Sequence, residues 1–177
     1  MKLVDEPLKG VLRFQLNRLA DIRGLFVKTY SRSVFTAAGA EFDFREEYYS
    51  VSGKDVIRGM HFQIPPHDHE KIVYCAMGAV EDVLLDLRAG RGFGKTYSLV
   101  LSASEPALLF IPRGIAHGFK SLTDDSLMIY KTSTEYAPEH DRGIRWDGFG
   151  FDWKCDDPIL SDRDRKHPSL AEFVTPF

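Results

Sequence analysis

Cysteine is scarce in this sequence of 177 residues, and the scarcity excludes several classes of protein. The only two cysteines, Cys75 and Cys155, lie far apart and outside any CxxC or zinc-type spacing, so neither a disulfide-stapled domain nor a cysteine zinc site is expected. We expect both to be buried or incidental thiols. No internal repeat, low-complexity segment or linker divides the chain, which favours one domain over residues 1–177.

Long apolar runs and a strong charge of one sign are also missing. No run approaches the roughly 20 apolar residues of a membrane helix, and residues 1–10 carry charges but no leader-like apolar stretch. These features favour a cytoplasmic protein without a membrane segment. The formal net charge of -3 gives no overall basic field for nucleic acid, so phosphate binding has to come from a local cluster. No GxGxxG follows a strand, which argues against a nicotinamide-binding loop.

The sequence does contain many short runs rich in branched apolar residues, separated by polar turns. A turn about every 8–15 residues is typical of an all-β sandwich or barrel. The expected strands cover residues 42–51, 56–63, 71–75, 80–88, 97–101, 107–111 and 127–131. Short helices are expected toward the two ends, over 31–38 with Gly39 after it and over 169–174.

Polar side chains interrupt one of these strands in Arg58-Gly-Met-His-Phe-Gln63. Residues two apart on a strand face the same way, which groups His61 with Gln63. The same rule sets Arg58 on the opposite face, unless the strand kinks at Gly59. His61 is then either a hydrogen-bonded core residue or a side chain that points into the lumen of a barrel, where it can do chemistry.

Four further residues stand out in or beside apolar strands. Lys71 opens such a strand, although lysine is rarely buried unless it is paired. His117 heads another strand beside a glycine that allows close approach of the backbone. Tyr130 and Tyr136 follow near the end of the strand-rich region, and a tyrosine at such a place can also simply fill a barrel.

Together these features resemble the dTDP-4-dehydrorhamnose 3,5-epimerase family. The most specific matches are Val56-Ile-Arg-Gly-Met-His-Phe-Gln63 with the two prolines after it, and Ile111-Pro-Arg-Gly-Ile-Ala-His-Gly-Phe119. The similarity runs in family order from about Asp21 to the C-terminus and ends with Leu160-Ser-Asp-Arg-Asp164. It implies a cupin jelly roll, a homodimer that exchanges its N-terminal strands within about residues 1–50, and catalysis without a metal or another cofactor.

The resemblance also implies roles for individual residues. His61 matches the catalytic base, and Asp164 matches the acid that hydrogen-bonds it. Lys71 matches the lysine beside the keto oxygen, and Tyr130 matches the acid that returns a proton on the other face. The implied substrate-binding residues are Arg58, Arg23 (reaching across the dimer), His117, Gln63, Arg165 and Tyr136.

These residue types suit the chemistry of a 4-keto sugar, whose C3–H and C5–H bonds are acidic because the carbanion is an enolate. An imidazole, with a pKa of about 6.5, suits a general base near neutral pH, and a carboxylate such as Asp164 would fix its tautomer. One preorganised donor such as Lys71 stabilises an oxyanion by about 3–4 kcal/mol. The phenol of Tyr130, with an ordinary pKa of about 10, keeps a proton to donate. No hydride moves, so no nicotinamide is needed.

The expected function is therefore inversion of C3, C5 or both in a nucleotide-diphosphate-linked 4-keto-6-deoxysugar. Two departures from the family leave the nucleotide open between dTDP and GDP, and the sugar open between hexose and heptose. Lys28 stands where the family usually has Glu, and Arg45-Glu-Glu-Tyr-Tyr-Ser50 retains only the serine of a Gln, Asn and Ser set. Both lie where nucleotide and dimer contacts are expected.

Three alternatives remain open from the sequence. A 3,4-ketoisomerase would share the fold, and a non-catalytic sugar-nucleotide-binding cupin would keep the arginines but have no use for a His61–Asp164 pair. A metal-dependent cupin would use His67-Asp-His69-Glu70 with His117 as ligands. In cupin metal sites, however, the Glu comes a few residues after the two histidines, so the spacing here disfavours a metal.

Overall fold

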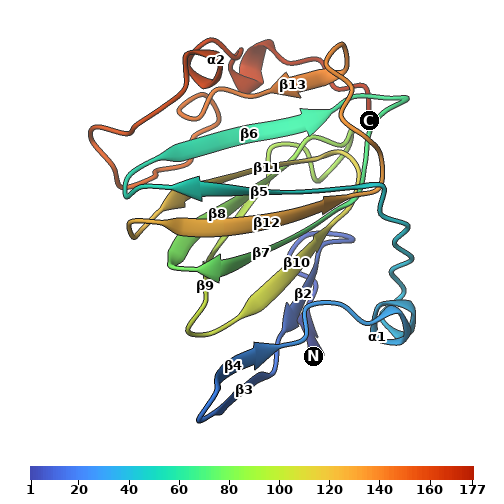
Figure 1. The fold of residues 1–177 in the computed structure, drawn as a ribbon. Coiled ribbons are helices and arrows are strands. Elements are labelled where there is room, and N and C mark those ends of the chain that lie inside the picture. Colours follow the sequence, from blue (N-terminus) through green and yellow to red (C-terminus); the bar gives the residue numbers. More distant parts are fainter.

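The computed structural model describes residues 1–177, and its chain forms two facing antiparallel sheets (Figure 1). In spatial order, the six-stranded sheet contains β1 (Lys2–Asp5), β2 (Leu12–Gln15), β10 (Ala107–Ile111), β7 (Lys71–Met77), β12 (Ser126–Thr132) and β5 (Glu46–Ser52). The five-stranded sheet contains β13 (Asp141–Gly143), β6 (Ile57–Gln63), β11 (Ile115–Ser121), β8 (Ala79–Asp86) and β9 (Thr96–Ser102). This architecture confirms the all-β class expected from the turn spacing.

Three hydrophobic clusters explain why the strands read as apolar runs. The inner cluster joins the two sheets, with Leu84 of β8 and Met128 of β12 among its buried members. A second cluster gathers around Phe35 of α1 (Arg32–Ala37), against the outer face of the six-stranded sheet. A third joins Leu85 of β8 to Trp153 in the C-terminal segment. Because both faces of the central strands are covered, residues of both parities are apolar there.

The N-terminal part contains short strands that the sequence did not reveal. β3 (Arg18–Asp21) and β4 (Gly24–Val27) form a separate hairpin that projects from the body of the molecule (Figure 1). The strand expected over 42–51 begins only at Glu46, because Phe42 packs in the cluster around α1 instead. Strands of four residues carry too little alternation to be recognised from sequence.

The C-terminal part is mostly irregular and crosses the outer face of the five-stranded sheet. Only a 3-10 turn, Leu170–Glu172, forms where a helix over 169–174 was expected. Phe173 is extended and packs its ring 5.4 Å from that of Phe62 on β6. An unexpected short helix, α2 (Asp162–Arg165), precedes this turn. No helix of the chain combines the length and apolar character needed to cross a membrane.

Candidate active site

A cavity between the two sheets collects polar side chains from both of them. It has two adjoining parts of about 310 and 270 Å³, and both are lined by Tyr48, His61 and Lys71. The first part is also lined by Glu46, Phe62, Gln63, His69, Thr132, Thr134, Tyr136, Asp141 and Arg163. The second is also lined by Ser50, Arg58, His117, Phe119 and Tyr130. A larger hollow of about 520 Å³ beside α1 contains none of the predicted site residues.

His61 and Asp164 form a hydrogen-bonded pair at the wall of this cavity. The imidazole Nε2 lies 2.6 Å from Asp164 Oδ1, although the two residues are 103 positions apart in the chain. Asp164 is buried, and its backbone N–H donates to Ser161 Oγ at the start of α2. Burial lowers the pKa of His61, and Asp164 acts in the opposite sense. Burial also opposes the charge of Asp164, but nearby His167 and the hydrogen bond from His61 outweigh it and lower the pKa of that carboxyl. Nε2 of a neutral His61 therefore donates to an ionised Asp164, and Nδ1 carries the free lone pair.

A β-bulge in β6 turns Arg58 and His61 toward the same cavity. His117 pairs with His61 and Phe119 pairs with Arg58, so β6 takes three residue steps where β11 takes two. The extra residue reverses the parity between Arg58 and His61. Gly59 allows this, since its φ of 137° favours glycine and a Cβ there would overlap the backbone of β11. Of the two readings open from the sequence, the structure therefore has the kinked strand.

Lys71 is a buried cation without an ion-pair partner. The residue is only 6% exposed, and its Nζ donates to the backbone oxygen of His61 at 3.3 Å. Burial lowers the pKa of Lys71 to about 8, although Asp141 and Asp82 counteract this effect. An ammonium so poorly compensated by the protein is suited to meet a negative charge on a bound molecule.

Tyr130 and His117 approach the cavity from opposite sheets. The Tyr130 hydroxyl lies 3.2 Å from Ser50 Oγ, and its ring stacks on Tyr48 at a centroid distance of 4.8 Å. Burial raises the pKa of Tyr130, so the phenol remains protonated. His117 Nε2 lies 2.7 Å from Oδ2 of buried Asp82. Burial raises the pKa of Asp82, and His117 counteracts this effect. The site therefore contains two histidine–aspartate pairs.

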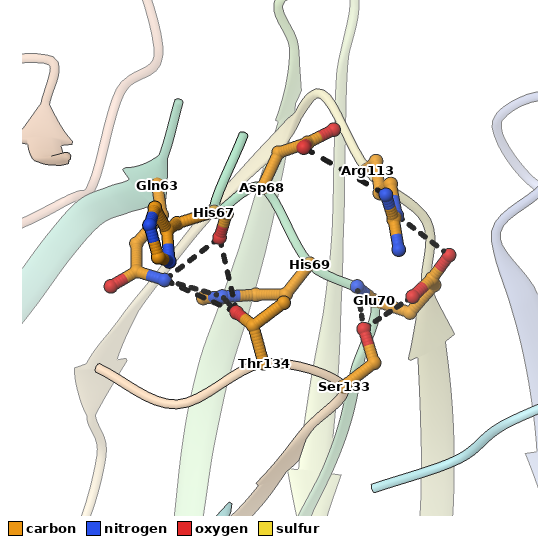
Figure 2. A network of polar contacts seen from close by, with 8 residues as sticks. All are labelled: Gln63, His67, Asp68, His69, Glu70, Arg113, Ser133 and Thr134. Atoms are coloured by element: carbon orange, nitrogen blue, oxygen red, sulfur yellow. Dashed lines mark hydrogen bonds and ion pairs between the residues drawn. The ribbon is translucent and has the colours of Figure 1, made fainter. Parts of the chain in front are cut away.

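Gln63 holds the rim of the cavity together (Figure 2). Its amide nitrogen donates to the backbone oxygen of His67 at 2.8 Å and lies 3.1 Å from His69 Nδ1 and 3.3 Å from Thr134 Oγ1. Its carbonyl accepts from the backbone N–H of Ala137 at 2.6 Å. The predicted substrate-binding residue thus lines the cavity with its amide already engaged by the protein.

Of the three remaining predicted residues, two lie outside the cavity and one lies at its rim. Arg23 is exposed in the turn between β3 and β4 and pairs with Asp21 at 2.6 Å. Arg165 is exposed on α2 and lines neither part of the cavity, whereas Arg163, two residues earlier in the same helix, lines the first part. Tyr136 is 59% exposed at the rim. The geometry of one chain therefore brings together eight of the ten predicted residues and leaves Arg23 and Arg165 outside.

Several residues in or beside the cavity were missed from the sequence. Asp82 gave a usable signal, because it is a charged residue inside the apolar strand 80–88. Tyr48 lies on β5, where alternate residues face the cavity. Asp141, Arg163 and His167 lie in short or irregular elements whose sequence has no periodicity, so nothing local marks them.

The proposed metal ligands face different partners. Glu70 Oε1 accepts from Arg113 Nε at 2.9 Å, and its side chain points away from His69 (Figure 2). His69 faces Gln63, and His117 faces Asp82. These residues therefore do not converge as ligands of one ion.

One other group of possible donors is compact. His61, Asp164 and His167 bring their ligand atoms within 4.8 Å of one another. Donor atoms around a tetrahedral zinc ion lie about 3.3 Å apart, whereas His61 Nε2 and Asp164 Oδ1 are separated by a hydrogen-bond distance of 2.6 Å. His61 and Asp164 are therefore spaced as a hydrogen-bonded pair, with His167 beside them.

The two-sheet fold and the enclosed imidazole, carboxylate, ammonium and phenol define a jelly-roll enzyme that moves protons on a small molecule. The chain belongs to the dTDP-4-dehydrorhamnose 3,5-epimerase family, whose model matches residues 5–172. It is thus a sugar-nucleotide epimerase with a cupin jelly roll, as its resemblance to this family implied.

Individual relatives agree with this assignment. The dTDP-4-dehydrorhamnose 3,5-epimerase of Mycolicibacterium smegmatis is 41% identical over 155 residues, which cover 86% of this chain and 77% of that protein. The enzyme of the same name from Shigella flexneri is 36% identical over 168 residues, 93% of each chain. The structure of the Legionella pneumophila 3,5-epimerase in complex with dTDP-4-keto-L-rhamnose has a TM-score of 0.92 and 26% identity, and the match covers 98% of this chain and 94% of that one.

Proposed function

We propose that this epimerase inverts C3, C5 or both in a nucleotide-diphosphate-linked 4-keto-6-deoxysugar, with His61 as base and Tyr130 as acid. The observation that carries the proposal is the position of these two groups. His61, paired with Asp164 at 2.6 Å, belongs to the five-stranded sheet, and Tyr130 belongs to the six-stranded sheet. A sugar ring lying between the sheets meets the base on one face and the acid on the other, which is the requirement for inversion.

In the first step, Nδ1 of His61 removes the proton next to the keto group. The C–H electron pair becomes the enolate π bond, and the carbonyl π pair moves to O4. Asp164 stabilises the imidazolium that results, because an ionised carboxylate attracts the positive charge. General base catalysis of this kind contributes roughly 10²–10⁴-fold to the rate.

The enolate oxygen then needs a positive partner, which Lys71 supplies. Its ammonium has no carboxylate within ion-pair distance, so the charge is available for O4. In the last step the enolate carbon takes a proton from Tyr130 on the opposite face, and O4 returns to a carbonyl. The phenolate then recovers a proton from solvent, and the imidazolium of His61 releases its proton to solvent, which restores both groups. Atoms and oxidation state are unchanged from substrate to product.

The nucleotide-diphosphate requires cationic and polar contacts at the cavity mouth. Arg58 lines the cavity beside His117, and its guanidinium fork matches phosphate oxygens. The names of the relatives favour dTDP as nucleotide. Glu46 and Tyr48 line the cavity in place of family residues that help to hold thymidine, so a GDP-linked sugar is the second substrate to test.

We further infer a homodimer in which the hairpin β3–β4 crosses to the partner. The hairpin exposes large apolar side chains that a lone chain leaves uncovered, namely Leu19, Ile22, Leu25 and Phe26. Strand β5 is the edge of the six-stranded sheet, and Tyr49 on it is 69% exposed. Exposed apolar surface beside an open sheet edge favours association. The exchange would carry Arg23, at the hairpin turn, toward the cavity of the partner.

The decisive experiment incubates the protein with dTDP- and GDP-linked 4-keto-6-deoxysugars in D₂O. Mass spectrometry counts the deuterium incorporated, and NMR locates it at C3 or C5. The wild-type protein should label and invert at least one carbon of one of these substrates, and His61→Asn should abolish both. Tight binding of a substrate without any exchange would instead support a non-catalytic binding protein.

Tyr130→Phe is the matched control for the assignment of base and acid. It leaves His61 and Asp164 in place and removes only the proton donor of the opposite face. Exchange should therefore persist while completed inversion slows by roughly 10²-fold or more, the contribution typical of one general acid. Equal loss of exchange and inversion would contradict this division of roles.

A further inference from the structure

A second histidine, His167, faces the carboxylate that holds His61. It follows α2, and its Nε2 lies 3.6 Å from Asp164 Oδ1, the same oxygen that lies 2.6 Å from His61 Nε2. The two imidazole rings are 5.8 Å apart and nearly perpendicular, at 73°. One buried carboxylate oxygen is therefore approached by two imidazoles, of which the reaction proposed above uses only His61.

The His167 ring packs on the backbone of the five-stranded sheet. Gly143 of β13 pairs directly with His61 of β6. A Cβ at Gly143 would overlap the ring of His167, so the ring packs on bare backbone opposite the base. The His167 side chain is only 13% exposed. Any other residue at 143 would move the ring away from Asp164.

The Nε2 atom of His167 is buried and has no hydrogen-bond partner in the ground state. Leaving a buried polar nitrogen unpaired costs about 1–3 kcal/mol, and such atoms usually have a functional or structural reason. The Nε2 atom lies 3.6 Å from Asp164 Oδ1, just beyond hydrogen-bond range. Hydrogen bonds at catalytic sites are often long in the free enzyme and shorten when substrate binds.

We propose that His167 is a positioning residue that donates to Asp164 and so limits how strongly this carboxylate stabilises the protonated form of His61. The inference rests on the proposed function of His61 as base. A second donor on Oδ1 shares the negative charge that the carboxylate otherwise offers to His61 alone. It also fixes the carboxylate, which leaves the imidazole ring in one orientation.

The electrostatics of the cluster agree with this role. His167 is the largest of the contributions that lower the pKa of Asp164 against the effect of burial. Without His167, the full charge of the carboxylate would act on His61 and raise its pKa. The other charged or titratable groups that line the cavity of His61 are Arg58, Arg163, Lys71, His69, His117, Asp141, Glu46, Tyr48, Tyr130 and Tyr136. A substitution at 167 changes none of them.

Two variants separate a hydrogen-bonding role from a packing role. His167→Gln keeps an N–H donor near the position of Nε2, and His167→Leu keeps apolar volume without a donor. Lys166→Ala, an exposed neighbour, is the control. NMR titration of the imidazole signals, assigned with His61→Asn, measures the pKa of His61 in each protein, and thermal unfolding confirms that each is folded.

We expect the pKa of His61 to rise in His167→Leu and to stay near the wild-type value in His167→Gln and Lys166→Ala. Because neutral His61 is the base, the acid limb of kcat/KM should move to higher pH in His167→Leu only. A rise of one in pKa lowers kcat/KM roughly 10-fold below the pKa, while the rate on the plateau stays within a few-fold.

Other outcomes are equally informative. Equal pKa values of His61 in the Leu, Gln and wild-type proteins would overturn the inference, as would a loss of rate that is the same at every pH. If the Leu variant does not fold, His167→Asn replaces it, because its shorter side chain withdraws the donor. The pKa of His61 is then compared among wild type, His167→Gln and His167→Asn. Failure of the proposed function is recognised separately, because wild-type protein would then show no exchange, while the NMR titration still reports on the cluster.

Discussion

Burial decides which single residues of this site hold a proton near neutral pH. Burial lowers the pKa of His61, which leaves the imidazole free to accept a proton, and raises the pKa of Tyr130, which keeps the phenol able to donate one. Lys71 is buried enough for its pKa to fall to about 8. Three residues with ordinary side chains thus acquire distinct roles from their surroundings.

The pH dependence of activity tests the role of Lys71. Its ammonium is lost as pH rises through about 8, so kcat/KM should fall over the same range. Lys71→Met should have activity roughly 10²-fold lower, from the loss of one oxyanion donor, and should lack this alkaline limb. Measurement of kcat/KM between about pH 6 and 10 decides the matter. An alkaline limb that persists unchanged in Lys71→Met would assign it to another group.

The same residue makes a prediction about stability. Folded Lys71 releases its proton at about 8, whereas an unfolded lysine does so at about 10.4. Between these values the unfolded chain binds more protons, so the contribution of Lys71 to the free energy of unfolding increases with pH. In Lys71→Met this rise should be missing from denaturation curves measured over that range.

At the level of elements, the bulge in β6 has the largest effect on the site. It places Arg58 beside His61, which a regular strand would not do. The C-terminal segment has a comparable effect, because α2 brings Asp164 to within hydrogen-bond distance of Nε2 of His61. Neither element is long or regular, yet each delivers a residue to which the proposed reaction assigns a role.

Gly59→Ala tests the bulge. The residue has a φ of 137°, and a Cβ would overlap the backbone of β11. Strained backbone of this kind costs about 1–3 kcal/mol, and the overlap adds to it, so the free energy of unfolding should fall by at least about 2 kcal/mol. Gly53→Ala is the control, since a Cβ there meets only Asp124 Oδ1 at 3.9 Å. Similar denaturant midpoints for the two variants would contradict the argument.

At the level of the whole molecule, the two sheets face one another across the cavity and the hairpin β3–β4 stands outside it (Figure 1). In the proposed reaction the facing sheets supply the base and the acid from opposite sides. The hairpin, with Ile22 fully exposed at its turn and Phe26 60% exposed, has no core of its own to pack against. A two-stranded hairpin is only marginally stable by itself, which is why we expect a second chain to cover it.

Sedimentation or light scattering tests this dimer. The wild-type protein should be a dimer at micromolar concentration, and Phe26→Asp should shift it toward monomer. Val174→Asp is the control, since Val174 is 89% exposed but lies in the C-terminal tail.

Exchange of Arg23 between chains is tested by complementation. Inactive His61→Asn and Arg23→Ala proteins are mixed, unfolded and refolded together, and the activity of the mixture is measured. Recovered activity requires that a site combine residues from two chains, and its absence from a mixed dimer would contradict the exchange.

The sequence by itself determined the main strands and singled out the polar residues within them. Apolar runs such as 80–88 and 107–111 can only be satisfied by burial, and they correspond to β8 and β10. His61, Lys71 and Tyr130 were recognisable because each is a polar residue in such a run. The family similarity then linked them to epimerase chemistry, and to Asp164 far along the chain.

Only the tertiary structure decided what these residues face. Periodicity describes a regular strand, so it could not show whether Arg58 points to the cavity. The bulge at Gly59, where β6 closely approaches β11, turns Arg58 toward it. Nothing in the sequence around His167 shows that its ring lies over Gly143, because this contact depends on the path of an irregular tail. Local sequence fixes local conformation, whereas pairs such as His61 and Asp164 are created by the packing of segments 103 residues apart.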